Sequence, residues 1–187
     1  MKKWSEIRQG IIDKMFMDEA EVNSENEKYA AKFAYFANEC LNNIANGVKP
    51  RIAVFDTETT EDNAEQVMPE DFLSFADMIN YLDGSPDPTI VYLGDKNIIL
   101  PKKGRYKIFY NALWKPIDED NMASDEVLPI DQSVLNCIPT YVAAQILAED
   151  DVQRSTILKN EYELMLSRLD TNIMYQANHF RSIGGWY

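Results

Sequence analysis

The sequence predicts an α+β protein that is mainly α: a four-helix bundle with an inserted small antiparallel β-sheet and an extra helix, plus an extended C-terminal tail. Apolar residues recur every three or four positions near both ends of the chain, which is typical of amphipathic helices. Alternating or wholly apolar runs between turn residues, which are typical of strands, fall in the middle. We therefore expect residues 1–49 and 127–177 to form the bundle, residues 50–126 an inserted β-rich subdomain with one helix, and residues 178–187 the tail.

Two helices are predicted before the insertion. The second starts at a capping-box pattern, in which Ser24 and Glu27 can each accept a hydrogen bond from the other's backbone amide, and it stops at Gly47. The apolar stripe of the first helix is Trp4, Ile7, Ile11 and Met15, and that of the second is Tyr29, Phe33, Phe36, Cys40 and Ile44.

The insertion is predicted to hold four strands and one helix. A strand over residues 51–57 leads into an acidic linker that ends at Asp71. A helix is expected next, because Phe72, Phe75, Ile79 and Leu82 recur at helical spacing and Gly84 can end it. Three further strands, over residues 89–93, 98–100 and 104–113, are separated by tight turns and therefore predict a meander.

Two helices are predicted after the insertion. Asp131 is placed to accept hydrogen bonds from the first free amides of a helix over residues 132–147, in which Pro139 predicts a bend. The last helix carries an apolar stripe from Leu158 to Ile173. We expect these two helices to pack against each other, because only a short turn separates them.

Composition limits the classes of function. The chain has 31 acidic and 18 basic residues, so its net charge of −13 argues against tight binding of nucleic acid through neutralised phosphates. Cys40 and Cys137 both fall on predicted apolar stripes, which favours buried free thiols and a reducing compartment. No apolar run approaches the roughly 20 residues that cross a bilayer, so we expect a soluble protein made in the cytoplasm, without membrane contact.

One short stretch is similar to a catalytic motif. Asp56 and Glu58 follow an apolar strand two residues apart, as in the first motif of the DnaQ-like 3′–5′ exonucleases, where two carboxylates share magnesium ions. This sequence departs from the later motifs of that family. Lys115 stands where the second motif has Asp, and after His179 the third motif would have Asp where this chain has Gly184. We predict no catalytic, cofactor-binding or metal-binding residues and keep the exonuclease as an alternative.

The order of elements carries a wider resemblance. Met68-Pro-Glu-Asp-Phe-Leu lies before the predicted meander, and Val127-Leu-Pro-Ile-Asp precedes Ile138-Pro-Thr-Tyr-Val-Ala-Ala-Gln-Ile-Leu-Ala-Glu-Asp-Asp. Together with the two N-terminal helices, this sequence resembles the head-to-tail adaptor (connector) proteins of short-tailed bacteriophages. The similarity covers most of the chain.

The resemblance implies a virion structural protein without enzymatic activity. Such proteins form a dodecameric ring beneath the portal, in the neck of the virion, after assembly in the host cytoplasm. The ring extends the channel through which double-stranded DNA passes without specific binding, and it offers a platform to tail tube and nozzle proteins. Another neck or tail-completion protein is the alternative within the same class.

The resemblance also implies a role for the C-terminal tail. In the family this segment inserts against the portal protein, and here the tail carries Phe180, Ile183, Trp186 and Tyr187 around the pair Gly184-Gly185. Folding of the tail back on the core is the alternative. The expected portal-docking residues are Phe180, Arg181, Ile183, Gly184, Gly185, Trp186 and Tyr187.

Overall fold

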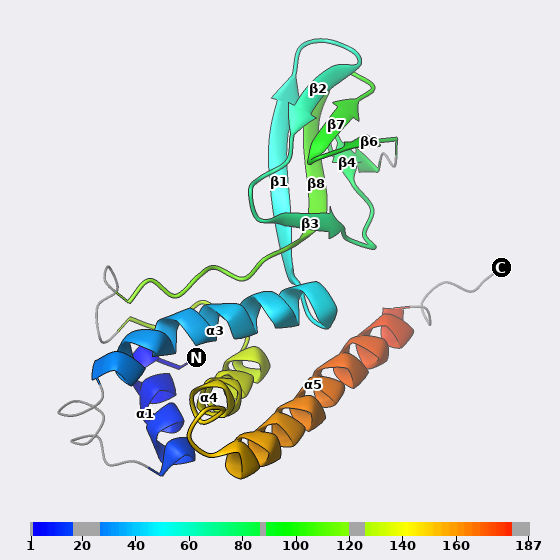
Figure 1. Cartoon of the computed structure of the whole chain (residues 1–187). Coiled ribbons are helices and arrows are strands. Elements are labelled where there is room, and N and C mark those ends of the chain that lie inside the picture. The colour runs from blue at the N-terminus through cyan, green and yellow to red at the C-terminus, as the bar shows by residue number, and fades with distance from the viewer. Residues whose placement is uncertain (1, 17–26, 87–88, 120–125, 181–187) are drawn as a thin grey trace. The chain divides into compact units, whose positions relative to one another are not determined.

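The computed structural model describes residues 2–16, 27–86, 89–119 and 126–180, with the backbone alone for residues 27–28 and 170–180. The chain divides into two compact units (Figure 1). The helical unit contains Met1–Lys49 and Lys115–Tyr187, and the β unit contains Pro50–Trp114. None of the helices in the described residues is long and apolar enough to span a membrane.

The helical unit is built around one central helix. Its helices are α1 (Trp4–Met15), α3 (Glu27–Gly47), α4 (Gln132–Ile146) and α5 (Val152–Phe180). α4 packs against the other three, which surround it in Figure 1. Apolar side chains therefore cover most of its circumference rather than a single stripe, and the predicted packing of the last two helices is confirmed.

Close contacts fix the helices around α4. A Cβ atom at Gly10 would lie only 3.3 Å from Cγ of Pro139, so the glycine lets α1 approach α4 closely. At the start of α5, the hydroxyl of Ser155 donates a 2.8 Å hydrogen bond to the carbonyl oxygen of Ala144. The interior of the unit contains fully buried side chains from α1, α3 and α4, among them Ile7, Ile11, Phe33, Leu41, Leu135 and Ile138.

The β unit contains two antiparallel sheets. The five-stranded sheet consists of β1 (Arg51–Thr59), β8 (Gly104–Ala112), β4 (Tyr81–Leu82) and β5 (Ser85–Pro86) in that order, with β3 (Phe72–Phe75) also paired to β8. The three-stranded sheet has the order β2 (Ala64–Val67), β7 (Asn97–Leu100) and β6 (Val91–Gly94).

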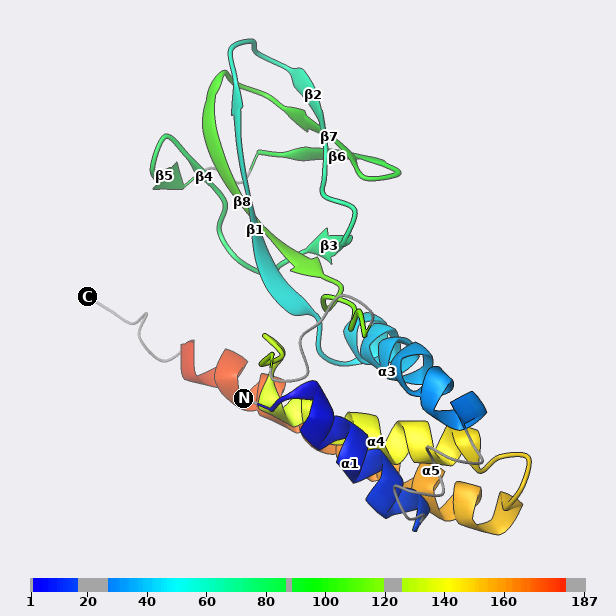
Figure 2. The same cartoon turned by 90° about the vertical axis from the view of Figure 1, so that its left-hand side faces the viewer.

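The two sheets are parts of one folded ribbon. β1 and β8 pair along their whole length. Where β1 ends and β8 begins, short turns connect β1 to β2 and β7 to β8, and β2 and β7 form a shorter pair (Figure 2). The turns are joined by hydrogen bonds from Lys103 N to Asp62 Oδ1 at 2.8 Å and from Asn63 N to Pro101 O at 3.3 Å. One core lies between the sheets, formed by Ala53, Met68, Phe72, Ile98, Leu100, Tyr106, Ile108, Tyr110 and Ala112.

The predicted fold class is wrong. The chain is 43% helical and 27% strand, with antiparallel sheets of five and three strands, so it is an α+β fold rather than a helical bundle with a small inserted sheet and an extra helix. The extra helix expected from Phe72 to Leu82 is replaced by β3 and β4. Phe72 stacks at 5.8 Å on Tyr110 of β8 and at 5.9 Å on Tyr92 of β6, so aromatic packing between distant segments overrides the helical spacing.

Two further expectations are corrected in this region. The predicted meander is wrong, because β7 and β8 lie in different sheets and only β6 and β7 form a consecutive hairpin there. The turn between β7 and β8 is held by Tyr106, whose hydroxyl donates to Lys102 O at 2.8 Å and accepts from Lys102 N at 3.1 Å. The acidic linker also contains a strand, β2.

The helices at the two ends of the chain agree better with the sequence. The first helix, over Trp4–Met15, and the cap at Asp131 are confirmed. The predicted cap at Ser24 lies outside the described residues. α5 continues to Phe180, so the backbone of residues 178–180 is helical where an extended tail was expected.

Candidate functional site

The predicted portal-docking residues fall almost entirely outside the described part of the chain. Phe180 is the last residue of α5, described by its backbone alone. Arg181, Ile183, Gly184, Gly185, Trp186 and Tyr187 lie beyond the described residues. Their role stays a prediction.

The two carboxylates of the exonuclease-like stretch lie on the exposed face of β1. Alternate residues of a strand point to opposite faces, so Asp56 and Glu58 share one side. The register places Asp56 opposite Lys107 and Glu58 opposite Arg105, both exposed on β8. Each carboxylate therefore has a positive side chain as its direct cross-strand neighbour, which favours mutual neutralisation of charge.

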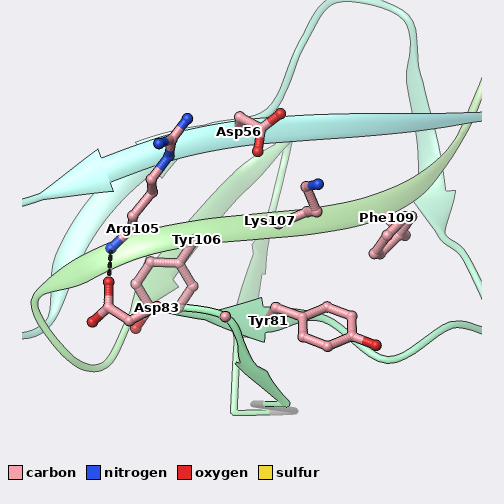
Figure 3. A pocket seen from close by; sticks show the side chains of 8 residues that line it. Asp56, Tyr81, Asp83, Arg105, Tyr106, Lys107 and Phe109 are labelled. Carbon is pink, nitrogen blue, oxygen red and sulfur yellow. Dashed lines mark hydrogen bonds between the residues drawn. The ribbon is translucent and has the colours of Figure 1, made fainter.

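An open cavity of about 720 Å³ adjoins these pairs (Figure 3). Asp56 and Lys107 line it together with Tyr81 and Phe109, whose rings lie 6.3 Å apart. Asp83 Oδ1 accepts a 2.9 Å hydrogen bond from the backbone amide of Arg105, drawn as the dashed line in Figure 3. The cavity can thus accept apolar and charged groups together.

The acidic side chains of this face were also compared with the donor sets of metal sites. Within the described part of the chain, no three His, Cys, Asp or Glu side chains come together as a metal site. Asp56 and Glu58 are brought to one face, as the sequence indicates. Lys115 belongs to the helical unit, and the side chain of His179 is not described.

The Pro-Glu-Asp-Phe segment of the resemblance has a structural role. Asp71 forms a salt bridge with Arg51 and accepts a 2.9 Å hydrogen bond from the hydroxyl of Tyr110. Its backbone oxygen also accepts from Leu113 N at 2.9 Å. Burial, followed by the hydrogen bond and the negative charge of Asp71, raises the pKa of Tyr110 to about 12. Asp71 therefore ties the start of β1 and the end of β8 to the chain entering β3.

The Leu-Pro-Ile-Asp segment is also structural. Asp131 accepts a 2.8 Å hydrogen bond from the amide of Ser133 at the start of α4 and forms a 3.0 Å salt bridge with Lys49. Burial opposes ionisation of this carboxyl, but the hydrogen bonds from Ser133 and Lys49 outweigh it and hold the pKa of Asp131 below its ordinary value. The residue joins the end of α3 to the beginning of α4.

A groove lies on the helical unit between α1 and α5, with α4 as its floor. It has a volume of about 720 Å³, and the exposed side chains of Phe16 and Ile157 contribute apolar surface to it. The guanidinium of Arg154 stacks 3.6 Å from the ring centroid of Phe16, and Lys14 forms a 2.5 Å salt bridge with Glu161 across it. The groove is suited to an apolar segment with charged margins.

The cysteines are not candidates for nucleophilic catalysis. Both Cys40 and Cys137 are buried and free, as the sequence predicts. Burial raises the pKa of the Cys137 thiol to about 11, and burial also raises that of Cys40, whose sulfur lies 3.9 Å from the hydroxyl of Tyr162. A thiol kept protonated is a weak nucleophile.

Apolar side chains on the outer faces of the β unit were not predicted from the sequence. Ile52 and Val54 are exposed on β1, and Val67, Val91 and Leu93 are exposed on the smaller sheet. A signal was available for β1, because Ile52-Ala-Val-Phe is apolar at every position and thus supplies both faces of a strand.

Comparison with known proteins adds no relative. No protein-family model matches this chain, and no curated protein matches it at a significant level.

Proposed function

We propose that this protein is a virion structural protein, the head-to-tail adaptor of a short-tailed bacteriophage. Copies of the chain form a ring beneath the portal, extend the DNA channel and connect the portal to tail proteins. The segment 178–187 docks against the portal.

One observation carries the proposal. The chain builds two units with separate cores, and each leaves apolar surface uncovered: the groove beside Phe16 and Ile157 on the helical unit, and the outer sheet faces of the β unit. Uncovered apolar surface of this kind is typical of interaction sites. A subunit with such surfaces on separate units suits a position among several partners.

Two further features support the proposal. Two segments that resemble the adaptor family contain Asp71 and Asp131. These residues hold strands and helices together, which is the role expected of a sequence pattern that maintains a fold. The net charge of −13 disfavours adhesion of DNA, which suits a channel through which DNA has to move.

The test is light scattering coupled to size-exclusion chromatography, on the protein alone and mixed with portal rings of short-tailed bacteriophages. We expect many copies to load on each portal ring. A chain truncated after Phe180 keeps α5 and is expected to lose this loading, whereas Val152→Asp, an exposed change at the other end of α5, is expected to retain it. Failure of the full chain to load on any portal would refute the proposal.

The exonuclease remains the second candidate, because Asp56 and Glu58 do share one exposed face beside a cavity. It requires magnesium-dependent release of nucleotides from DNA that is lost in Asp56→Ala and in Glu58→Ala. The adaptor proposal expects no such release from the unaltered protein.

A further inference from the structure

The outer face of the five-stranded sheet is partly apolar. Ile52 and Val54 on β1 point away from the core and are 52% and 44% exposed. Phe109 of β8 lies directly opposite Val54 on the same face. Farther along the two strands, the same face carries the charged pairs of Asp56 with Lys107 and Glu58 with Arg105. This surface is called the large-sheet face.

The outer face of the three-stranded sheet is also apolar. Val67 of β2 is 63% exposed, and Val91 of β6 is 49% exposed. Ile99 of β7 lies between Glu65 and Val91, each of them its direct cross-strand partner, and so belongs to the same face. Asn97 of β7, the cross-strand partner of Val67, adds one polar side chain. This surface, Glu65, Val67, Val91, Asn97 and Ile99, is called the small-sheet face.

The two faces point in opposite directions, because the two sheets share one core between them. They also differ from each other in strand number and in charge. An antiparallel sheet normally turns polar side chains to water on its outer face, so the aliphatic residues on both outer faces make these surfaces candidates for contact with another chain.

We propose that the β units of neighbouring copies stack on one another, with the large-sheet face of one copy against the small-sheet face of the next. The inference deepens the proposed adaptor function, since a ring requires a contact between two different patches that repeats around an axis. Two unlike faces on opposite sides of one unit supply such a contact. Face-to-face packing of sheets places them about 10 Å apart, with side chains of both filling the space between.

Charge favours this pairing over contact between two small-sheet faces. Glu65 is the only charged residue named in the small-sheet face, and it is acidic. On the large-sheet face, Lys107 and Arg105 lie opposite Asp56 and Glu58, so this face carries charges of both signs and does not repel Glu65 of the next copy. Two small-sheet faces in contact would instead bring two Glu65 carboxylates together.

The size of the contact indicates how it is used. Three strands of about four residues cover roughly 200 Å² of sheet plane, far below the roughly 800 Å² per partner of a stable complex. The stacked faces therefore hold a pair of copies weakly and gain strength when many copies repeat the contact around a closed ring.

The test is sedimentation of the full chain over a wide concentration series, with variants that block one face each. We expect the unaltered chain to associate reversibly with rising concentration. Val54→Asp blocks the large-sheet face and Val67→Asp the small-sheet face, and each is expected to weaken association about tenfold or more, because the contact would bury an unpaired carboxylate.

Mixing the two variants distinguishes unlike from like faces. Val54→Asp keeps its small-sheet face and Val67→Asp its large-sheet face, so a mixture is expected to form one-to-one dimers that grow no further. Association of Val67→Asp alone at the level of the unaltered chain would overturn the proposal, because it would show contact between two large-sheet faces. A monomer at every concentration of the unaltered chain would overturn it as well.

Control variants distinguish loss of the contact from loss of folding. Val54→Thr and Val67→Thr keep the branched shape of the side chain and should fold, yet weaken association. Val152→Asp on α5 makes the same Val-to-Asp change on the helical unit and should leave association unchanged.

Portal loading tells the two proposals apart. If Val54→Asp and Val67→Asp load fully on the portal and self-associate like the unaltered chain, the proposed contact between sheet faces is refuted and the adaptor function is retained. If self-association depends on both faces but the protein loads on no portal, the contact between sheet faces is supported and the adaptor function is refuted.

Discussion

The helical unit and the β unit use their apolar residues differently. In the helical unit, α4 is covered by three other helices, so nearly every apolar side chain of α4 is buried. In the β unit, one ribbon folds over on itself and buries one face of each sheet, while residues such as Ile52 and Val67 remain outside. The difference teaches that the central helix α4 has almost all of its apolar side chains covered, whereas the sheets of the β unit keep apolar side chains on their outer faces.

The largest expected effect on stability comes from truncating one buried side chain in each of the two cores. Ile138→Ala in α4 and Ile108→Ala in β8 each remove a fully buried side chain, at a cost of about 2–5 kcal/mol. Because the two residues belong to separate cores, each change should lower the melting transition of its own unit in calorimetry. Equal shifts of one common transition in both variants would show that the two units unfold together and would contradict the separation.

A smaller effect is expected at a glycine of the β unit. Gly104 has φ +139°, and a Cβ there would lie 2.6 Å from Asp83 Oδ2 and 2.7 Å from Leu82 Cδ1. Gly104→Ala should therefore destabilise the β unit by about 1–3 kcal/mol in urea unfolding. Gly84→Ala is the matched control, because Gly84 also has positive φ, +80°, but no atom within 4 Å of the added Cβ. Equal losses in both variants would mean that the contact with Asp83 contributes nothing.

The same contrast explains what the sequence predicts. A helix is a local structure, so the spacing of Trp4, Ile7 and Ile11 and the cap at Asp131 are enough to place α1 and the start of α4. The strands β3 and β4 depend on partners about 30 residues away on β8, such as Tyr110 opposite Phe75. Local spacing carries no record of those contacts, so the apolar residues from 72 to 82 are equally compatible with a helix.

The candidate surfaces follow the same rule. The sequence shows that Asp56 and Glu58 share a side of a strand, because that needs only alternation. It does not show that Lys107 and Arg105 lie opposite them, since pairing of β1 with β8 joins residues about 50 positions apart. The groove on the helical unit likewise depends on α1 and α5, which come from opposite ends of the chain.

An intermediate effect, confined to the helical unit, is expected at Asp131. Asp131→Ala removes the hydrogen bond to Ser133 and the salt bridge to Lys49 and should cost about 0.5–2 kcal/mol at neutral pH. Because the pKa of Asp131 is lowered in the folded protein, this stabilisation is fully present above the unfolded pKa of about 3.9 and is lost as the pH falls through the lower folded pKa.

Urea unfolding of the helical unit at several pH values measures this effect. The difference between the unaltered chain and Asp131→Ala should shrink below about pH 4. Asp131→Asn is the control, since it keeps an N-cap acceptor and loses only the charge. A difference that stays constant down to strongly acidic pH would rule out the carboxylate as its source.

The smallest effect is expected at the mouth of the groove on the helical unit. Lys14 and Glu161 form a salt bridge between α1 and α5, but their side chains are 36% and 44% exposed, so water and salt screen the pair. Lys14→Ala should lower the free energy of unfolding by only about 0.2–1 kcal/mol, and less at high salt. Lys159→Ala, at an exposed lysine of α5, serves as the control for loss of positive charge. Salt-independent loss of several kcal/mol in Lys14→Ala alone would mean that the α1–α5 contact, rather than burial on α4, holds the unit together.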